Sequence, residues 1–167
     1  GLGETFMFKK LPEIVDYIRS KNNGIIISVS TNAHLPISVK MAEDLADKID
    51  TIQVSIDGIG KVYEKVRLKS DYSFFYENML QTIEACRGKR ATVMFNFVAI
   101  KENYQDMAEV VELAGKLGVK YVNITPFNVA SVTIHDKTYY DFFQTTEFKS
   151  ELKRAKAMAK NYPEIEF

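Results

Sequence analysis

The sequence predicts an α/β fold built from repeated parallel strand–helix units, and two observations support this. Four apolar runs of strand length begin near residues 25, 51, 91 and 120, and each is followed by residues with helical periodicity. Strands that alternate with helices of this length pair in parallel through right-handed crossovers. An open sheet of four or five strands and a section of a barrel both satisfy the pattern, so periodicity does not choose between them.

Composition predicts one ordinary globular domain over residues 1–167. The chain is 46% hydrophobic and 26% charged, which excludes disordered and fibrous classes. Lys+Arg and Asp+Glu both total 22, so no basic field favours nucleic acid. No apolar run reaches the roughly 18 residues that a membrane span needs, so no membrane partner is expected. One cysteine, Cys86, excludes an internal disulfide and indicates a reducing cytoplasm.

The first half of the chain contains two predicted helices and two predicted strands. A helix begins near Leu11 and ends at Gly24, and Ser38 caps a second helix that continues to Ile49. The run 25–30 between them is a predicted strand, apolar enough to be covered on both faces. The strand 52–56 then runs into a polar turn closed by glycine.

The turn after the second strand is the first candidate ligand site. Ser55, Asp57 and Gly58 follow a buried strand, and ligands of α/β sheets bind just past the carboxyl ends of strands. Gly58 permits a sharp turn. Arg67 lies in the charged segment 61–67, and a guanidinium can bind a carboxylate through two hydrogen bonds. An arginine in a charged loop is more often solvated, so both interpretations stay open here.

The second half repeats the pattern. A helix over 73–87 places Cys86 on its apolar face, as a small buried hydrophobe. The strand 91–100 is interrupted by Asn96, whose amide must find partners in the sheet, a ligand or water. The remaining predicted elements are a helix from Met107 to Gly118, a strand over 121–126 ended by Pro126, a long connection with an aromatic run at Tyr139–Phe143, and a helix from Thr146 to Pro163.

Taken together, the strand ends resemble the radical S-adenosylmethionine (SAM) superfamily. Gly1–Thr5 looks like its glycine-glycine-glutamate motif, and Ser30–Ala33 resembles its threonine-asparagine-glycine strand ending. Ser55–Gly58 matches the ending of the next strand, and Val62–Arg67 resembles the stretch that carries the SAM-binding arginine. The resemblance extends to about residue 130. It implies part of a partial (β/α)6 TIM-like barrel.

The resemblance also implies roles for single residues. The Gly3 backbone and Glu4 would meet the amino group of SAM, because carboxylates and carbonyls accept hydrogen bonds from an ammonium. Arg67 would pair with the methionyl carboxylate. Asn32 and Asp57 are expected to stabilise turns. The remaining implied contacts are Ser55 with the ribose or methionyl part, Asn96 with the ribose, and the backbone around Pro126 with the adenine.

The chain departs from the family pattern in its cysteines. The family needs a C-x3-C-x2-C loop whose thiolates hold a [4Fe-4S] cluster, whereas this chain has Cys86 alone. The expectation is therefore a truncated core from an iron-sulfur, oxidoreductase-type enzyme that forms a 5′-deoxyadenosyl radical from SAM. The chain itself would have no metal ligands, no tightly held cofactor and no activity, and would self-associate through an exposed barrel edge. The substrate, a peptide or a small molecule, is unknown. Leu2, Thr5 and Ala33 also differ from the usual motif residues.

A second interpretation belongs to another class of protein. The chain would be a complete small α/β binding or interaction module without catalysis. In that case Gly1–Thr5 is incidental, and Tyr139–Phe143 forms a surface for a partner.

Overall fold

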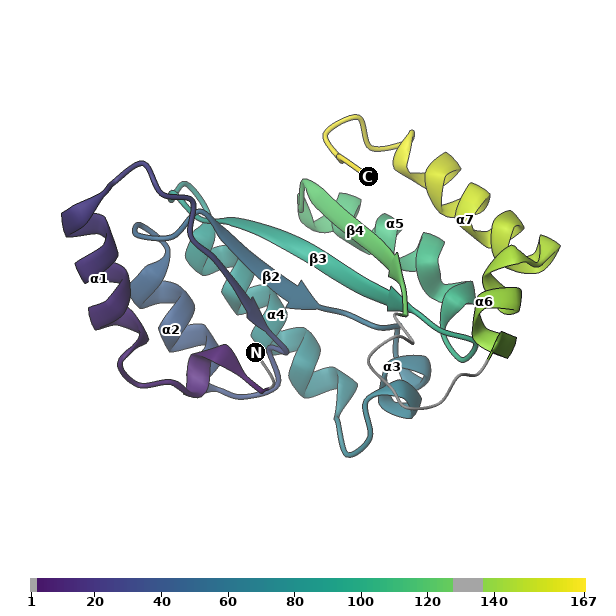
Figure 1. Ribbon diagram of the computed structural model, residues 1–167, viewed down its shortest axis with the longest axis horizontal. Helices are drawn as coiled ribbons and strands as arrows, with labels where there is room; N and C mark the ends of the chain where they lie inside the picture. The colour runs from purple at the N-terminus through teal and green to yellow at the C-terminus, as the bar shows by residue number, and fades with distance from the viewer. Residues whose placement is uncertain (1–2, 128–136) are drawn as a thin grey trace. The chain divides into compact units, whose positions relative to one another are not determined.

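The computed structural model describes residues 3–127 and 137–167. Its strands form one four-stranded sheet in the order β1-β2-β3-β4, and helices alternate with the strands along the chain (Figure 1). β1 pairs with β2 in parallel. These observations confirm the predicted α/β class with repeated βα units, which is the arrangement expected of part of a TIM-like barrel.

Most helices and strands follow the predicted order of elements, but Ser38 lies inside the helix Ile37–Leu45, whose N-cap is Pro36, so the predicted Ser38 cap is wrong. In chain order the elements are η1 (Thr5–Met7), α1 (Leu11–Lys21), β1 (Ser28–Thr31), α2 (Ile37–Leu45), β2 (Thr51–Ser55), α3 (Lys61–Val66), α4 (Tyr72–Cys86), β3 (Thr92–Ala99), η2 (Tyr104–Asp106), α5 (Met107–Leu117), β4 (Tyr121–Pro126), α6 (Lys137–Gln144) and α7 (Thr146–Ala159).

The chain divides into two compact units. The first comprises Gly1–Ser55 and Ser70–Phe95, and the second comprises Ile56–Lys69 and Asn96–Phe167. The single domain expected for residues 1–167 stays a prediction.

In the first unit, the strands bury one face only. Ser28 of β1 lies opposite Thr51 of β2, and the burial of β1 alternates along its length, with Val29 and Thr31 buried and the serines exposed. The prediction that the run 25–30 is covered on both faces is therefore wrong. The strand begins at Ser28, and Ile26, just before it, is 79% exposed.

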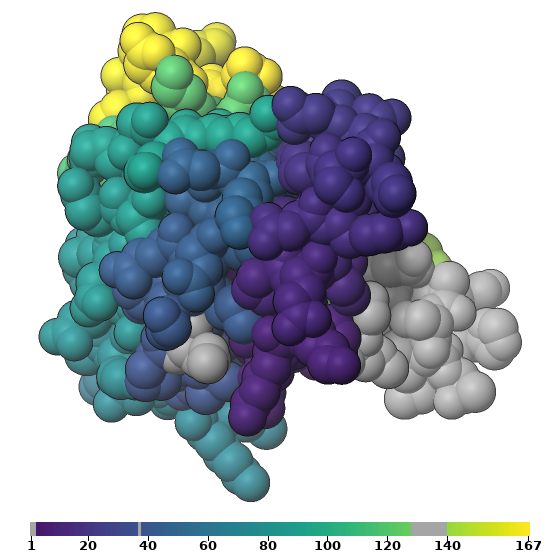
Figure 2. All heavy atoms as spheres, turned by 90° about the vertical axis from the view of Figure 1, so that its left-hand side faces the viewer, coloured from purple at the N-terminus to yellow at the C-terminus, as the bar shows by residue number. Residues whose placement is uncertain are grey.

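The helices of this unit pack mainly through α2 and α4, and α1 lies against α2. Figure 2 shows α1, in purple, beside α2, in blue, on one face. Asp71 is the N-cap of α4, and its side chain accepts a hydrogen bond from Phe74 N in the usual N-cap arrangement. Cys86 at the end of α4 is buried, as its helical spacing predicts.

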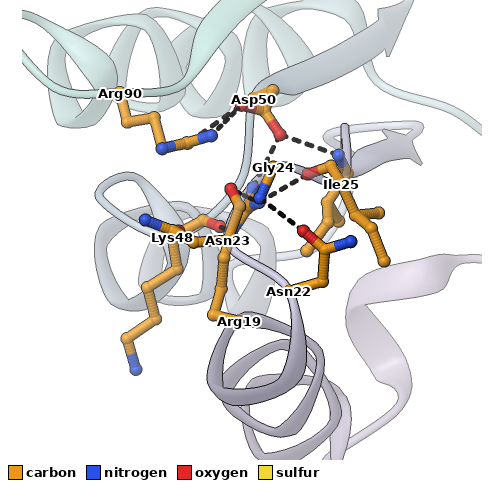
Figure 3. A network of polar contacts seen from close by, with 9 residues as sticks. Arg19, Asn22, Asn23, Gly24, Ile25, Lys48, Asp50 and Arg90 are labelled. Atoms are coloured by element: carbon orange, nitrogen blue, oxygen red, sulfur yellow. Dashed lines mark hydrogen bonds and ion pairs between the residues drawn. The ribbon is translucent and has the colours of Figure 1, made fainter.

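A polar network ties the ends of several elements in the first unit (Figure 3). Arg19 of α1 donates to Lys48 O at 2.6 Å and to the Asp50 carboxylate at 2.6 Å. Asp50 also accepts from Ile27 N at 2.7 Å and from Arg90 at 2.7 Å. Burial alone would raise the pKa of Asp50, but these donors outweigh it and lower the pKa to about 2. The network joins residues that lie before β1, β2 and β3.

In the second unit, α5 packs on α7. α5 ends at Gly118, which has a left-handed φ of 72°, so the predicted glycine stop is confirmed. The end of the chain pairs with β4, because Val122 N donates to Glu166 O at 3.1 Å and Glu166 N donates to Lys120 O at 2.7 Å. Nothing in the local sequence pattern indicates this pairing.

Two helices of the second unit were not predicted. The segment 61–67, interpreted as a charged loop, contains α3, and the long connection before residue 146 contains α6. Part of the aromatic run packs against other aromatic rings of the second unit, with Phe142 and Phe143 half-buried. Phe142 and Phe143 contact Phe148, with ring centroids 5.4 and 5.1 Å from it, and Tyr104 lies 5.1 Å from Phe142. Among the described residues, no helix is long and apolar enough to cross a membrane.

Candidate functional site

The turn that follows β2 carries an ion pair in the second unit. Arg67 donates from Nε and Nη2 to the same Asp57 oxygen, Oδ2, at 3.0 and 2.7 Å. The other carboxylate oxygen of Asp57 accepts from Val98 N at 2.9 Å. Asp57 is 7% exposed, whereas the Arg67 side chain keeps 28% of its surface exposed. The carboxylate is therefore fixed from two sides, and the guanidinium is reached by solvent.

The same turn is braced by η2 and the residues before it. Asn103 Nδ2 donates to Asp57 O at 3.1 Å and to Val98 O at 2.9 Å, and its Oδ1 accepts from Ile100 N at 2.7 Å. Asp106 accepts from Ile59 N at 2.8 Å. Because Asn103 is 1% exposed and bonded at both ends of its amide, it is a rigid support for the turn.

Asp106 lies in a mixed electrostatic environment. Burial raises the pKa of its carboxyl above the ordinary value, and the negative charge of Glu109 adds to this effect. The hydrogen bond from Ile59 N and the charge of Arg154 act in the opposite direction. Arg154 itself binds Glu109 at 2.9 Å. The brace on the turn therefore adjoins a charged cluster of α5 and α7.

Two predicted site residues of the second unit lie on β3 and β4. Asn96 has found a partner within the protein, since Asn123 Nδ2 donates to Asn96 Oδ1 at 2.8 Å. Its backbone oxygen accepts from Ile56 N at 3.0 Å. Pro126 ends β4 and is exposed, and the next residue, Phe127, donates its N–H to Ala99 O at 3.0 Å. The side chains of Asn96 and Asn123 face away from the core.

The other three predicted residues belong to the first unit. Glu4 accepts from Phe6 N at 3.1 Å and from Asn32 N at 2.7 Å, so its carboxylate reaches the residue that follows β1. Gly3 has a φ of 124° and open space where a Cβ would lie. Ser55 ends β2, half-buried, and makes no side-chain hydrogen bond to the described residues.

The structure thus places Gly3, Glu4 and Ser55 in one unit and Arg67, Asn96 and Pro126 in the other. It confirms that Asp57 stabilises its turn. Asn32 does the same after β1, because its Oδ1 accepts from His34 N at 2.9 Å.

Sequence reasoning missed Asn103 as a support of the site. It lies 46 positions from Asp57, and an Asn between a strand and a helix is an ordinary loop residue. The sequence pattern does not predict the pairing of Arg67 with Asp57 either, although it marks both residues as candidates. No local spacing rule joins residues ten positions apart across a turn.

The chemistry of these residues fits one of the two implied cofactors. A [4Fe-4S] cluster needs several thiolates, but Cys86 is 6% exposed, and burial raises the pKa of its thiol to about 11. Within residues 3–127 and 137–167, no three His, Cys, Asp or Glu side chains gather to hold a metal ion. The Arg67 guanidinium suits the carboxylate of SAM, and Glu4 has lone pairs left for an ammonium.

Comparison with known proteins assigns the family. The family model of the Radical SAM superfamily matches residues 1–114. The chain is also 30% identical over 112 residues to the Fe-coproporphyrin III synthase of Methanosarcina barkeri (strain Fusaro / DSM 804), a match that covers 66% of this chain and 27% of that protein. The chain thus spans about a quarter of this curated relative's length. Together with the order of its strand-end motifs, the match over most of its length shows that the chain belongs to the radical SAM superfamily.

Proposed function

We propose that this chain is the SAM-binding part of the barrel of a longer radical SAM enzyme. The observation that carries the proposal is the family match over residues 1–114. It is combined with a solvent-reached arginine, Arg67, which is bonded to Asp57 in the turn at the carboxyl end of the parallel strand β2. Ligands of such folds bind at this end of the strands. The relative is much longer than its matched part, which supports a parent with further segments.

Within this proposal, charged residues bind the charged ends of SAM. Arg67 pairs with the methionyl carboxylate, and Glu4 with the Gly3 backbone accepts the amino group. A guanidinium–carboxylate pair is a strong, directional contact, and a carboxylate is a sound acceptor for an ammonium. Ser55 would contact the ribose or the methionyl part of SAM, Asn96 would contact the ribose, and the backbone around Pro126 would hold the adenine.

The cluster of the parent would be held elsewhere, because the residues of this chain do not fit it. In the parent, SAM would be cleaved reductively to a 5′-deoxyadenosyl radical that abstracts hydrogen from the substrate. The parent would be a cytoplasmic enzyme, in keeping with one reduced thiol. The coding sequence upstream of Gly1 tests the proposed parent. A C-x3-C-x2-C loop after an apolar strand there supports it, and a start codon directly before Gly1 overturns it.

Substitutions in the full-length protein test the residue roles. Arg67→Ala and Glu4→Ala should each weaken SAM binding by about 1–3 kcal/mol, because each removes a contact to a charged group. Arg87→Ala is the matched control, since Arg87 directly follows α4, is exposed and pairs with Glu84. SAM affinity measured by titration calorimetry should fall for the first two and stay unchanged for the control. Unchanged affinity in all three variants contradicts the assigned roles.

We also propose that the chain, taken alone, self-associates through the β1 edge. β1 pairs with β2 at one edge of the described sheet. Ile25 and Ile26, which precede β1, are 44% and 79% exposed. Phe8 and Tyr17 of the same unit are 52% and 65% exposed. A free strand edge beside apolar side chains is a template for another copy. Sedimentation should show dimers at high concentration for the wild type and fewer for Ile26→Lys. A clean monomer for the wild type contradicts this.

A further inference from the structure

The Arg67 guanidinium is held along one edge only. Nε and Nη2 donate to Asp57 Oδ2, and Arg67 lies over the ring of Tyr63, 5.9 Å from its centroid. Within the described part of the chain, Nη1 has no acceptor, and the side chain is 28% exposed. The edge that carries Nη1 is therefore the one that can meet a ligand.

The partner of Arg67 is itself fixed more firmly than most surface carboxylates. Asp57 Oδ1 accepts from Val98 N, and its backbone oxygen accepts from Asn103 Nδ2. An arginine side chain otherwise explores many rotamers, and ordering it on binding costs entropy. Pairing with a buried, immobile carboxylate removes much of that freedom before any ligand arrives.

Hydrogen bonds other than those of Arg67 also hold the turn. Val98 N, Asn103 Nδ2 and the bond from Ile59 N to Asp106 already hold it. Since these bonds do not involve Arg67, we expect its two hydrogen bonds to Asp57 mainly to order the arginine side chain.

We propose that Asp57 is a positioning residue, which holds the Nε/Nη2 edge of Arg67 so that its Nη1 edge is presented to the carboxylate of an amino-acid-like ligand. The inference rests on the proposed function, since SAM is the ligand that brings this carboxylate. Asp57 would not touch the ligand. It acts through Arg67 alone, so its effect on ligand affinity should vanish when Arg67 is removed.

The variant Asp57→Asn separates the positioning of Arg67 from the bracing of the turn after β2. The Asn amide oxygen can still accept from Val98 N, while its amide nitrogen cannot accept from Arg67. In the full-length protein, this variant should lower SAM affinity about tenfold. In an Arg67→Ala background, the same substitution should cause no further loss. Asp106→Asn is the matched control, because Asp106 braces the same turn through Ile59 N without contacting Arg67.

A second readout needs no ligand. The readout is the rate at which the Nε–H of Arg67 in this chain exchanges with water, measured by NMR. This rate should rise about tenfold in Asp57→Asn relative to the wild type and should stay unchanged in Asp106→Asn. Equal loss of SAM affinity in both Asn variants would trace the effect to the lost negative charge near the turn rather than to the contact with Arg67, and would overturn the inference. Unchanged exchange in Asp57→Asn overturns it as well. If Arg67→Ala leaves SAM affinity intact, the role that the proposed function assigns to Arg67 fails, while the exchange rates still decide whether Asp57 holds Arg67.

Discussion

Gly58 lies between Asp57 and the start of α3, and its backbone has a φ of 144°. A Cβ placed there would lie 2.8 Å from Val62 Cγ1 and 3.0 Å from Tyr63 N. Two features therefore disfavour any side chain at this position: its backbone conformation and the close approach of α3. The glycine that sequence reasoning placed at this turn is required by the structure.

We predict that Gly58→Ala lowers the free energy of unfolding by about 1–3 kcal/mol, because it adds both backbone strain and a steric clash. Gly88→Ala is the matched control. Its φ of 71° is also positive, but no atom lies within 4 Å of an added Cβ. Urea unfolding followed by circular dichroism should show a clearly smaller loss for Gly88→Ala. Equal losses would mean that the contact with α3 is unimportant.

At the scale of single elements, the packing of α5 depends on a small residue that periodicity does not mark. A Cβ on Gly115 would overlap the Cδ1 and Cγ atoms of the Tyr162 ring. Tyr162 follows α7, so the ring covers α5 at the point where the helix has no side chain. Helix propensity alone favours alanine at this site by about 1 kcal/mol.

We predict that Gly115→Ala destabilises the protein, because overpacking a close contact costs about 1–3 kcal/mol and outweighs the gain in propensity. In a Tyr162→Ala background the sign should reverse, since the clash is gone and the propensity gain of about 1 kcal/mol remains. A double-mutant cycle by urea unfolding measures both values. Additive effects in the cycle would show that the ring and the glycine do not interact.

The elements that sequence reasoning found and missed differ in length and in regularity. The helix predicted from Met107 to Gly118 has a long apolar face and a glycine stop, and α5 matches it. α3 has 6 residues and α6 has 8, too few for a clear helical period. Ile25–Ile27 look like strand residues but lie outside β1. A strand also needs a neighbour to pair with, and β-propensity alone cannot supply it.

At the scale of the larger units, the carboxylate of Asp50 joins the helix before β1 to residues that precede β2 and β3 (Figure 3). Its donors lower the pKa of Asp50 from 3.8 to about 2. A depressed folded-state pKa means that the stabilisation is present above the unfolded-state value and is lost as pH falls toward the folded-state value. The relevant window therefore runs from about pH 4 down to about pH 2.

We predict that Asp50→Asn destabilises the protein at pH 6, because it leaves Arg19 and Arg90 without a charged partner. The difference from the wild type should shrink as pH falls from 4 to 2, since the wild-type carboxylate becomes protonated in that range. Urea midpoints at pH 6, 4 and 2.5 measure the effect. Asp44→Asn is the control, because Asp44 only faces Lys40 at 3.7 Å on the surface. A constant difference at all three pH values would contradict the role of the charge.

Local sequence patterns were enough to predict the class of fold and the family. Alternating apolar periods and glycine stops are local properties, so βα units follow from them, and the order of the strand-end motifs indicated the radical SAM superfamily that the family match shows. Only the tertiary structure decided which polar groups meet. The Asp57–Asn103 contact joins residues 46 positions apart, and the Arg19–Asp50 contact joins residues 31 apart. Such contacts depend on strand register and on the path of each crossover, which local patterns do not encode.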